Sequence, residues 1–230
     1  MVVASAFASF TPLIGEKRVI FYRLDWHAYQ QILNALGNHR TARLHYLCGT
    51  LEITMPLEDH EFLSELIGRF IYFLVSELGQ KIKTMGSTTL EREHLNRGAE
   101  PDKAYYIQNQ AKVAGKTVDL KYDPPPDLVV EVDITHSDIE KLTLYAAIGV
   151  SEFWRYNGKT WSIYQLQDAD TNYSSEESST VAKQYIEVEN SPSFPFVPKA
   201  KLYEFLEQAR LDEIEAETDL RKWIREIISD

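Results

Sequence analysis

Residues 124–156, PPPDLVVEVDITHSDIEKLTLYAAIGVSEFWRY, constrain the fold of this chain more than any other segment. Side chains of a strand alternate between two faces, so Asp127, Glu131 and Asp133 share one face of an otherwise apolar strand. An unpaired buried carboxylate costs several kcal/mol. The acidic face must therefore meet water, a cation or a metal ion.

The chain has 230 residues, 44% of them hydrophobic and 26% charged, which is enough for one substantial core. We expect a main domain over residues 1–198 and a helical extension over residues 199–230. No window approaches the roughly 18 consecutive apolar residues of a membrane span, so we expect no membrane partner. The single cysteine, Cys48, excludes an internal disulfide and a cysteine-rich zinc site, and it fits a cytoplasmic protein.

The formal net charge is −11, which argues against non-specific binding of nucleic acid over the whole surface. An acidic chain can still keep a local basic groove. Metal-binding carboxylates also add negative formal charge, which a bound cation offsets. The charge balance therefore does not exclude a nucleic-acid substrate.

The periodicity of apolar residues and the turn signals predict a series of helices and strands. The predicted helices cover residues 25–36, 58–78, 137–148, 201–210 and 214–228. The predicted strands cover residues 18–24, 41–47, 51–55, 81–90, 101–107, 127–134, 150–156, 159–166 and 180–188. This order predicts an α/β (α+β) fold, with a mixed central sheet flanked by helices. A strand, a short crossover helix and a second strand over residues 127–156 make a parallel pair plausible there.

The crossover helix places a lysine toward the core. Ser137 and Glu140 have the spacing of a capping box, which predicts that the helix starts there. Lys141 lies on one stripe with Leu144, Tyr145 and Ile148. The Lys141 ammonium can therefore reach the acidic face of the preceding strand. From these residues alone, a buried counter-ion and a functional lysine are both open interpretations.

Asp102 supplies a further carboxylate, in a proline-led strand that starts at Pro101. Alone, an Asp next to a Pro is most often a turn residue. Together with Glu131 and Lys141, it completes the set needed for metal-assisted phosphodiester hydrolysis. Two carboxylates would hold Mg²⁺ (or Mn²⁺), and a cation would lie near the attacking water.

The chain resembles the Uma2-like restriction endonuclease family of the PD-(D/E)XK nuclease superfamily. The resemblance covers residues 22–156. It rests on His60-Glu61, Pro101-Asp102, the PDLVVEV run at 126–132, Lys141 with LYAA at 144–147, and GVSEFW at 149–154.

The resemblance implies a restriction-endonuclease-like core for the main domain and assigns roles to its residues. By similarity, Asp102, Glu131 and the Val132 carbonyl would bind the metal, and Lys141 would assist the nucleophilic water. The E-x-K motif of the superfamily would place the lysine at position 133, where this chain has Asp133, so the ammonium would come from the helix. Asp133 would then be an extra metal ligand or an ion-pair partner.

Two further residues are possible members of the site. His60 and Glu61 open the long helix, where a first-turn surface position is the simpler interpretation. The resemblance implies instead that both residues support the metal ligands from a neighbouring position.

These observations predict a Mg²⁺-dependent endonuclease that cuts double-stranded DNA. Cutting both strands of a duplex suits two-fold symmetry, so we expect a homodimer. A catalytically inactive nuclease-fold module for binding or assembly is the alternative, motivated by Asp133 and by the acidic charge balance. An acidic interaction protein that works through residues 201–230 is a third interpretation.

Overall fold

The structure is a computed structural model that describes residues 17–37, 41–86, 88–134, 137, 139–168 and 183–229. Residues 180–182 of the last predicted strand lie outside this range. The helices are α1 (Trp26–Leu36), α2 (Glu58–Glu77), α3 (Gln110–Val113), α4 (Lys141–Ile148), α5 (Lys199–Ala209), α6 (Glu213–Ser229) and a 3₁₀ turn, η1 (Glu93–Leu95). The strands are β1 (Lys17–Phe21), β2 (Arg43–Leu47), β3 (Thr50–Met55), β4 (Lys83–Thr84), β5 (Leu90–Arg92), β6 (Arg97–Ala99), β7 (Lys103–Tyr106), β8 (Leu128–Val132), β9 (Glu152–Tyr156), β10 (Trp161–Asp168) and β11 (Lys183–Val188).

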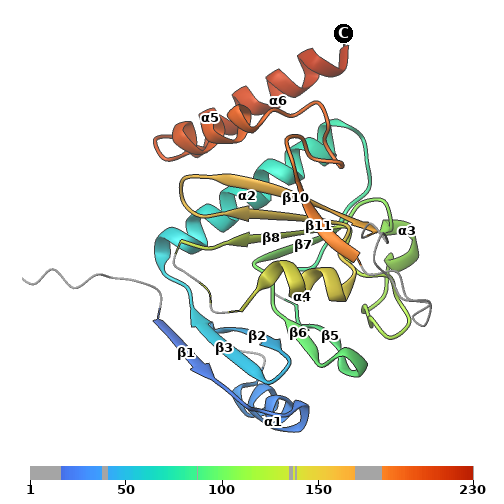
Figure 1. Ribbon diagram of the computed structural model, residues 1–230. Coiled ribbons are helices and arrows are strands. Elements are labelled where there is room, and N and C mark those ends of the chain that lie inside the picture. Colours follow the sequence, from blue (N-terminus) through green and yellow to red (C-terminus); the bar gives the residue numbers. More distant parts are fainter. Residues whose placement is uncertain are drawn as a thin grey trace, which may run out of the picture.

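The larger sheet has six strands in the order β11-β10-β9-β8-β7-β4. β8 and β9 pair in parallel across the α4 crossover, and the other neighbours pair antiparallel. Figure 1 shows α2 beside this sheet, with α5 and α6 lying outside α2. The predicted mixed sheet flanked by helices and the predicted parallel pair are confirmed.

The smaller sheet has five antiparallel strands in the order β1-β3-β2-β6-β5. Its central hairpin turns at Cys48 and Gly49, whose φ angles are 45° and 96°. Positive φ at both central residues gives the twist that a two-residue hairpin needs. Figure 1 shows this sheet next to α1, on the side of the larger sheet opposite α2.

β8 is buried on both faces, as expected for a central strand between layers. Leu128, Val130 and Val132 point into the core cluster that α2, α5 and α6 complete. Val129 points the other way, into a cluster with residues of α4. The predicted alternation of β8 is therefore confirmed, and it fixes the side on which Glu131 lies.

The two C-terminal helices share the core of α2. Leu202 of α5 and Leu220 of α6 are buried in the same cluster as the apolar residues of α2. Outside that cluster, Arg221 and Arg225 of α6 pair with Glu77 of α2 at 2.9 and 2.7 Å. The boundary at residue 198 stays a prediction.

Two predicted elements differ most from the structure. The strand expected over residues 81–90 is two short strands in different sheets, because the chain leaves the larger sheet after β4 and enters the smaller one at β5. The crossover helix begins at Lys141 and not at Ser137. Glu140 caps the helix by accepting from Leu142 N at 3.2 Å, while the Ser137 hydroxyl donates to buried Glu52 at 3.0 Å.

Candidate active site

A small cavity lies where the two sheets meet α2 and α4. Its volume is about 20 Å³, which is room for roughly one water-sized particle. Six of the predicted site residues line it: His60, Asp102, Glu131, Val132, Asp133 and Lys141. Glu61 does not line the cavity, and its half-exposed side chain pairs with Arg43 at 3.1 Å.

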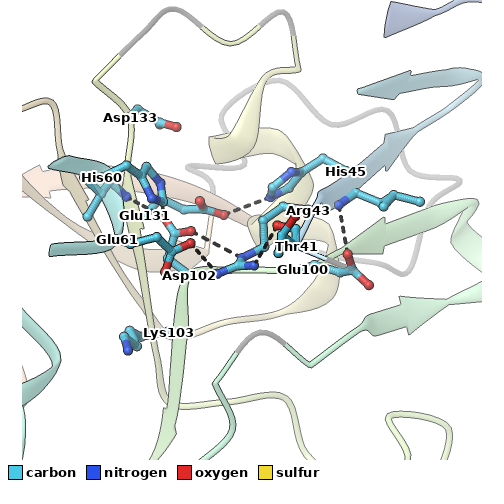
Figure 2. A network of polar contacts seen from close by, with 12 residues as sticks. Thr41, Arg43, His45, His60, Glu61, Glu100, Asp102, Lys103, Glu131 and Asp133 are labelled. Carbon is cyan, nitrogen blue, oxygen red and sulfur yellow. Dashed lines mark hydrogen bonds and ion pairs between the residues drawn. The ribbon is translucent and has the colours of Figure 1, made fainter. Parts of the chain in front are cut away.

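Asp102 is buried just before β7, and two neighbours fix one of its oxygens. Its Oδ2 accepts a hydrogen bond from Val132 N at 2.8 Å. The same oxygen lies 3.1 Å from Nε2 of His60 (Figure 2). Burial raises the pKa of Asp102 above its ordinary value, and the nearby Glu131 carboxylate raises it further. His60 and Lys141 act in the opposite direction but do not cancel the increase.

Glu131 lies at the end of β8 with both carboxylate oxygens in contact with protein groups. Its Oε2 accepts from Lys141 Nζ at 2.8 Å, and its Oε1 lies 3.0 Å from His45 Nε2 and accepts from the Tyr145 hydroxyl. Burial acts to raise the pKa of Glu131. The Lys141 ammonium and His45 outweigh that effect, so the pKa lies below its ordinary value.

Asp133 holds the Lys141 ammonium from the strand side. Lys141 Nζ lies 2.5 Å from Asp133 Oδ1, and Arg155 Nε lies 2.9 Å from Asp133 Oδ2. Burial acts to lower the pKa of Lys141, but Asp133 and Glu131 outweigh it and hold the pKa above its ordinary value. Asp133 is thus an ion-pair partner of Lys141 in this structure.

Asp127 lies apart from Glu131 and Asp133, although the alternation of side chains predicts that the three share one face. It precedes β8 and accepts hydrogen bonds from Ile107 N at 2.7 Å and Asn109 N at 2.9 Å. The prediction that Lys141 reaches all three acids is therefore wrong for Asp127. Its carboxylate ties down the loop after β7, at the other end of the strand from Glu131.

The smaller sheet contributes residues that are not among the predicted site residues. Arg43 and His45 of β2, Glu52 and Thr54 of β3 and Arg18 of β1 all line the cavity. In β2 and β3 these residues alternate with Leu44, Tyr46 and Leu51, which are buried against α1. The polar face of this hairpin is therefore one wall of the site. In the sequence, polar residues that alternate with apolar ones on two adjacent strands are the pattern that indicates such a face.

Each carboxylate that lines the cavity has a cation near it. Lys141 serves Glu131 and Asp133, while Arg18 Nε lies 3.6 Å from Glu52 Oε2 and Arg43 Nε lies 3.7 Å from Asp102 Oδ1. The two arginine contacts are longer than a hydrogen bond. The pairs with Lys141 are therefore tight, and those with the arginines are loose.

The donor set fits a magnesium-type ion with few protein ligands. Asp102 and Glu131 offer hard oxygen atoms beside a cavity for one small particle, and their mutual repulsion is what a cation between them would relieve. Among the described residues, no three His, Cys, Asp or Glu side chains form a ready metal cluster. Mg²⁺ is commonly bound through one or two carboxylates, with waters and substrate phosphates completing its shell, so this arrangement is compatible with it.

Comparison with known proteins places the chain in a family. A search of curated proteins gave no match. Of solved structures, a protein described as a putative nuclease belonging to DUF820 from Anabaena variabilis ATCC 29413 is similar, with 12% identity and a TM-score of 0.44. The match covers 70% of this chain and 89% of that one.

No helix in the described part of the chain is long and apolar enough to span a membrane.

The family model of Uma2, whose description is "Putative restriction endonuclease", matches residues 26–195. That match includes Asp102, Glu131 and Lys141 and all the strands that carry the site except β1. The chain therefore belongs to the Uma2 family of restriction-endonuclease-like proteins.

Proposed function

We propose that this protein is a Mg²⁺- or Mn²⁺-dependent endonuclease that hydrolyses phosphodiester bonds of double-stranded DNA. The observation that carries the proposal is the meeting of Asp102, Glu131 and Lys141 at one small cavity. Asp102 directly precedes β7, Glu131 lies near the end of the neighbouring β8, and Lys141 begins the crossover helix α4. Membership of a nuclease family supports the same reaction class.

Each residue has a distinct proposed role. Asp102 and Glu131 would hold the metal, and the Val132 carbonyl would be a third ligand. When bound, the metal would supply positive charge to the phosphate and to the attacking water. Lys141 stays protonated and can orient the water or stabilise the developing negative charge, while Asp133 keeps its ammonium in place. His60 fixes Asp102, and Glu61 fixes Arg43.

Plasmid cleavage tests this proposal. Asp102→Asn and Glu131→Gln should each lower Mg²⁺-dependent nicking by at least about a hundredfold, the usual loss on removing one electrostatic contact to a transition state. Glu65→Gln removes one negative charge from a half-exposed position on α2, so it should cleave like the wild type. Circular dichroism would establish that all three variants are folded. Unchanged nicking by a folded Asp102 or Glu131 variant would refute the assignment.

A second function is favoured by one feature of Glu131. Both of its oxygens already contact protein donors, as a site without turnover would allow. A nuclease-fold module that binds nucleic acid without cutting it is therefore the alternative. Thermal unfolding in a Mn²⁺ or Mg²⁺ series separates the two functions, because an ion that binds the folded state raises its stability by about 2.7 kcal/mol at a hundred times its Kd. No shift, together with no cleavage, would favour the module.

We further propose a homodimer, because two copies related by a two-fold axis can address both strands of a duplex. Sedimentation with and without a DNA duplex would test this assembly. A cytoplasmic location, suggested by the single cysteine, belongs to the same proposal.

A further inference from the structure

Two arginines stand in one row across the smaller sheet. Arg18 of β1 and Arg43 of β2 are both paired in register with Thr54 of β3, which lies between them. Cross-strand partners point to the same face of a sheet, and all three residues line the cavity. We call these three residues the arginine row. The next row along this face contains Glu52 and His45.

The arginine row lies nearer to solvent than the carboxylate end of the cavity. The side chains of Arg18 and Arg43 are 17% and 16% exposed, whereas that of Asp102 is 2% exposed and that of Lys141 is 8% exposed. A molecule that approaches the two proposed metal ligands from outside would therefore meet the guanidinium groups. Their position suits a group that binds substrate.

Neither carboxylate beside the arginine row depends on an arginine for its hydrogen bonds. Asp102 already accepts from Val132 N, and Glu52 accepts from the Ser137 hydroxyl at 3.0 Å. Arg43 uses its terminal nitrogens for Thr41 O and Glu61, while its buried Nε makes no hydrogen bond to a described residue (Figure 2). The contacts of the terminal nitrogens with Thr41 O, at 3.4 Å, and Glu61, at 3.1 Å, lie at exposed positions where a phosphate can replace them, whereas the buried Nε faces Asp102 at 3.7 Å.

We infer that the arginine row binds phosphate oxygens of a nucleic-acid strand next to the bond that Asp102 and Glu131 would address. A planar guanidinium donates two parallel hydrogen bonds to a phosphate, and the hydroxyl of Thr54 between the two arginines can add a third donor. The row also gives a chain of net charge −11 two positive charges at one wall of the site, where a polyanion would need them. This inference rests on the proposed function.

The test measures DNA binding apart from cleavage, by fluorescence anisotropy of a labelled duplex with Ca²⁺ in place of Mg²⁺, over a series of salt concentrations. Arg18→Met and Arg43→Met should each weaken binding about tenfold, as expected for a charge-assisted hydrogen bond. Each should also lower the slope of log K against log salt by about 1, because one phosphate contact is lost. Lys17→Met is the matched control: Lys17 is the neighbour of Arg18 on β1 and points to the opposite face.

Arg18→Met decides the outcome if Arg43→Met disturbs Asp102, since Arg18 does not contact that carboxylate in the structure. Wild-type slopes in both arginine variants, or an equal effect of Lys17→Met, would overturn the inference while wild-type plasmid cleavage kept the proposed function intact. A wild-type protein that binds DNA through the arginine row but never cuts would support the inference and refute the catalytic proposal. Absence of DNA binding by the wild type would overturn the inference.

Discussion

Replacing Lys141 with Met should cost the protein a large part of its stability at neutral pH. The ammonium lies 2.8 Å from Glu131 Oε2 and 2.5 Å from Asp133 Oδ1, and all three side chains are less than one tenth exposed. At an effective dielectric constant of about 20, each contact is a Coulomb attraction of about 6 kcal/mol. Much of this offsets the desolvation of the three groups, and breaking a buried pair from one side typically costs about 3–5 kcal/mol.

The loss should depend on pH in a defined direction. In the wild type, the lowered pKa of Glu131 stabilises the fold above the ordinary glutamate pKa, and this contribution is lost only as the pH falls through the lower folded value. Without the ammonium, the effect of burial remains and favours the protonated carboxyl. The destabilisation of Lys141→Met should therefore be largest near pH 7 and shrink as the pH falls toward 4.

Urea unfolding at several pH values measures this effect. Lys103→Met is the matched control, because Lys103 Nζ also lies 2.8 Å from a carboxylate, that of Glu65, but the Glu65 side chain is 55% exposed. A pair of this kind contributes at most about 1 kcal/mol. The double variant Glu131→Gln/Lys141→Met should recover part of the loss. An effect of Lys141→Met that equals the control, or that does not change with pH, would refute the reasoning.

Two other positions give sharp expectations. His60→Leu removes an imidazole that lies 3.1 Å from Asp102 Oδ2 and partly offsets the rise in the Asp102 pKa. The Asp102 pKa should therefore rise further, and the acid limb of the pH profile of DNA cleavage should move to higher pH. An unmoved limb would contradict this. Gly98→Ala would place a Cβ 2.8 Å from the ring carbon Cζ of buried Tyr29, and this overpacking should cost about 1–3 kcal/mol in urea unfolding. Gly115→Ala has open space around its Cβ but a positive φ of 71°, so it should show backbone strain without overpacking.

The fold was predictable where local chemistry and burial agree. The Cys48-Gly49 turn, the long apolar stripe of α2 and the alternation of β8 each follow from residues within one element. The division of residues 81–90 between two sheets was not predictable, because tertiary pairing decided it. The predicted start of α4 is wrong for a similar reason. The hydroxyl of Ser137, the expected capping residue, donates a hydrogen bond to Glu52, which is 85 positions away in the chain.

Asp102, Glu131, Asp133 and Lys141 meet at one cavity, as the sequence predicts, but residues of the smaller sheet that form its other wall are not among the predicted ones. Arg43 and His45 alternate with buried residues of β2, which is the pattern of a strand with one face in water. Only the placement of the smaller sheet against the larger one turns that face into part of the site. Tyr145 was placed on the correct stripe of α4, yet its hydroxyl bond to Glu131 depends on the packing of α4 over β8.

The position of Asp133 follows from where the lysine is. When the ammonium comes from α4, its long side chain has to be fixed at the far end, and buried ammonium groups are stable only with partners. Asp133 provides that partner at 2.5 Å, and Arg155 at 2.9 Å balances its second oxygen. The carboxylate at position 133 is therefore consistent with a retained ammonium beside Glu131, and its presence does not by itself argue for an inactive site.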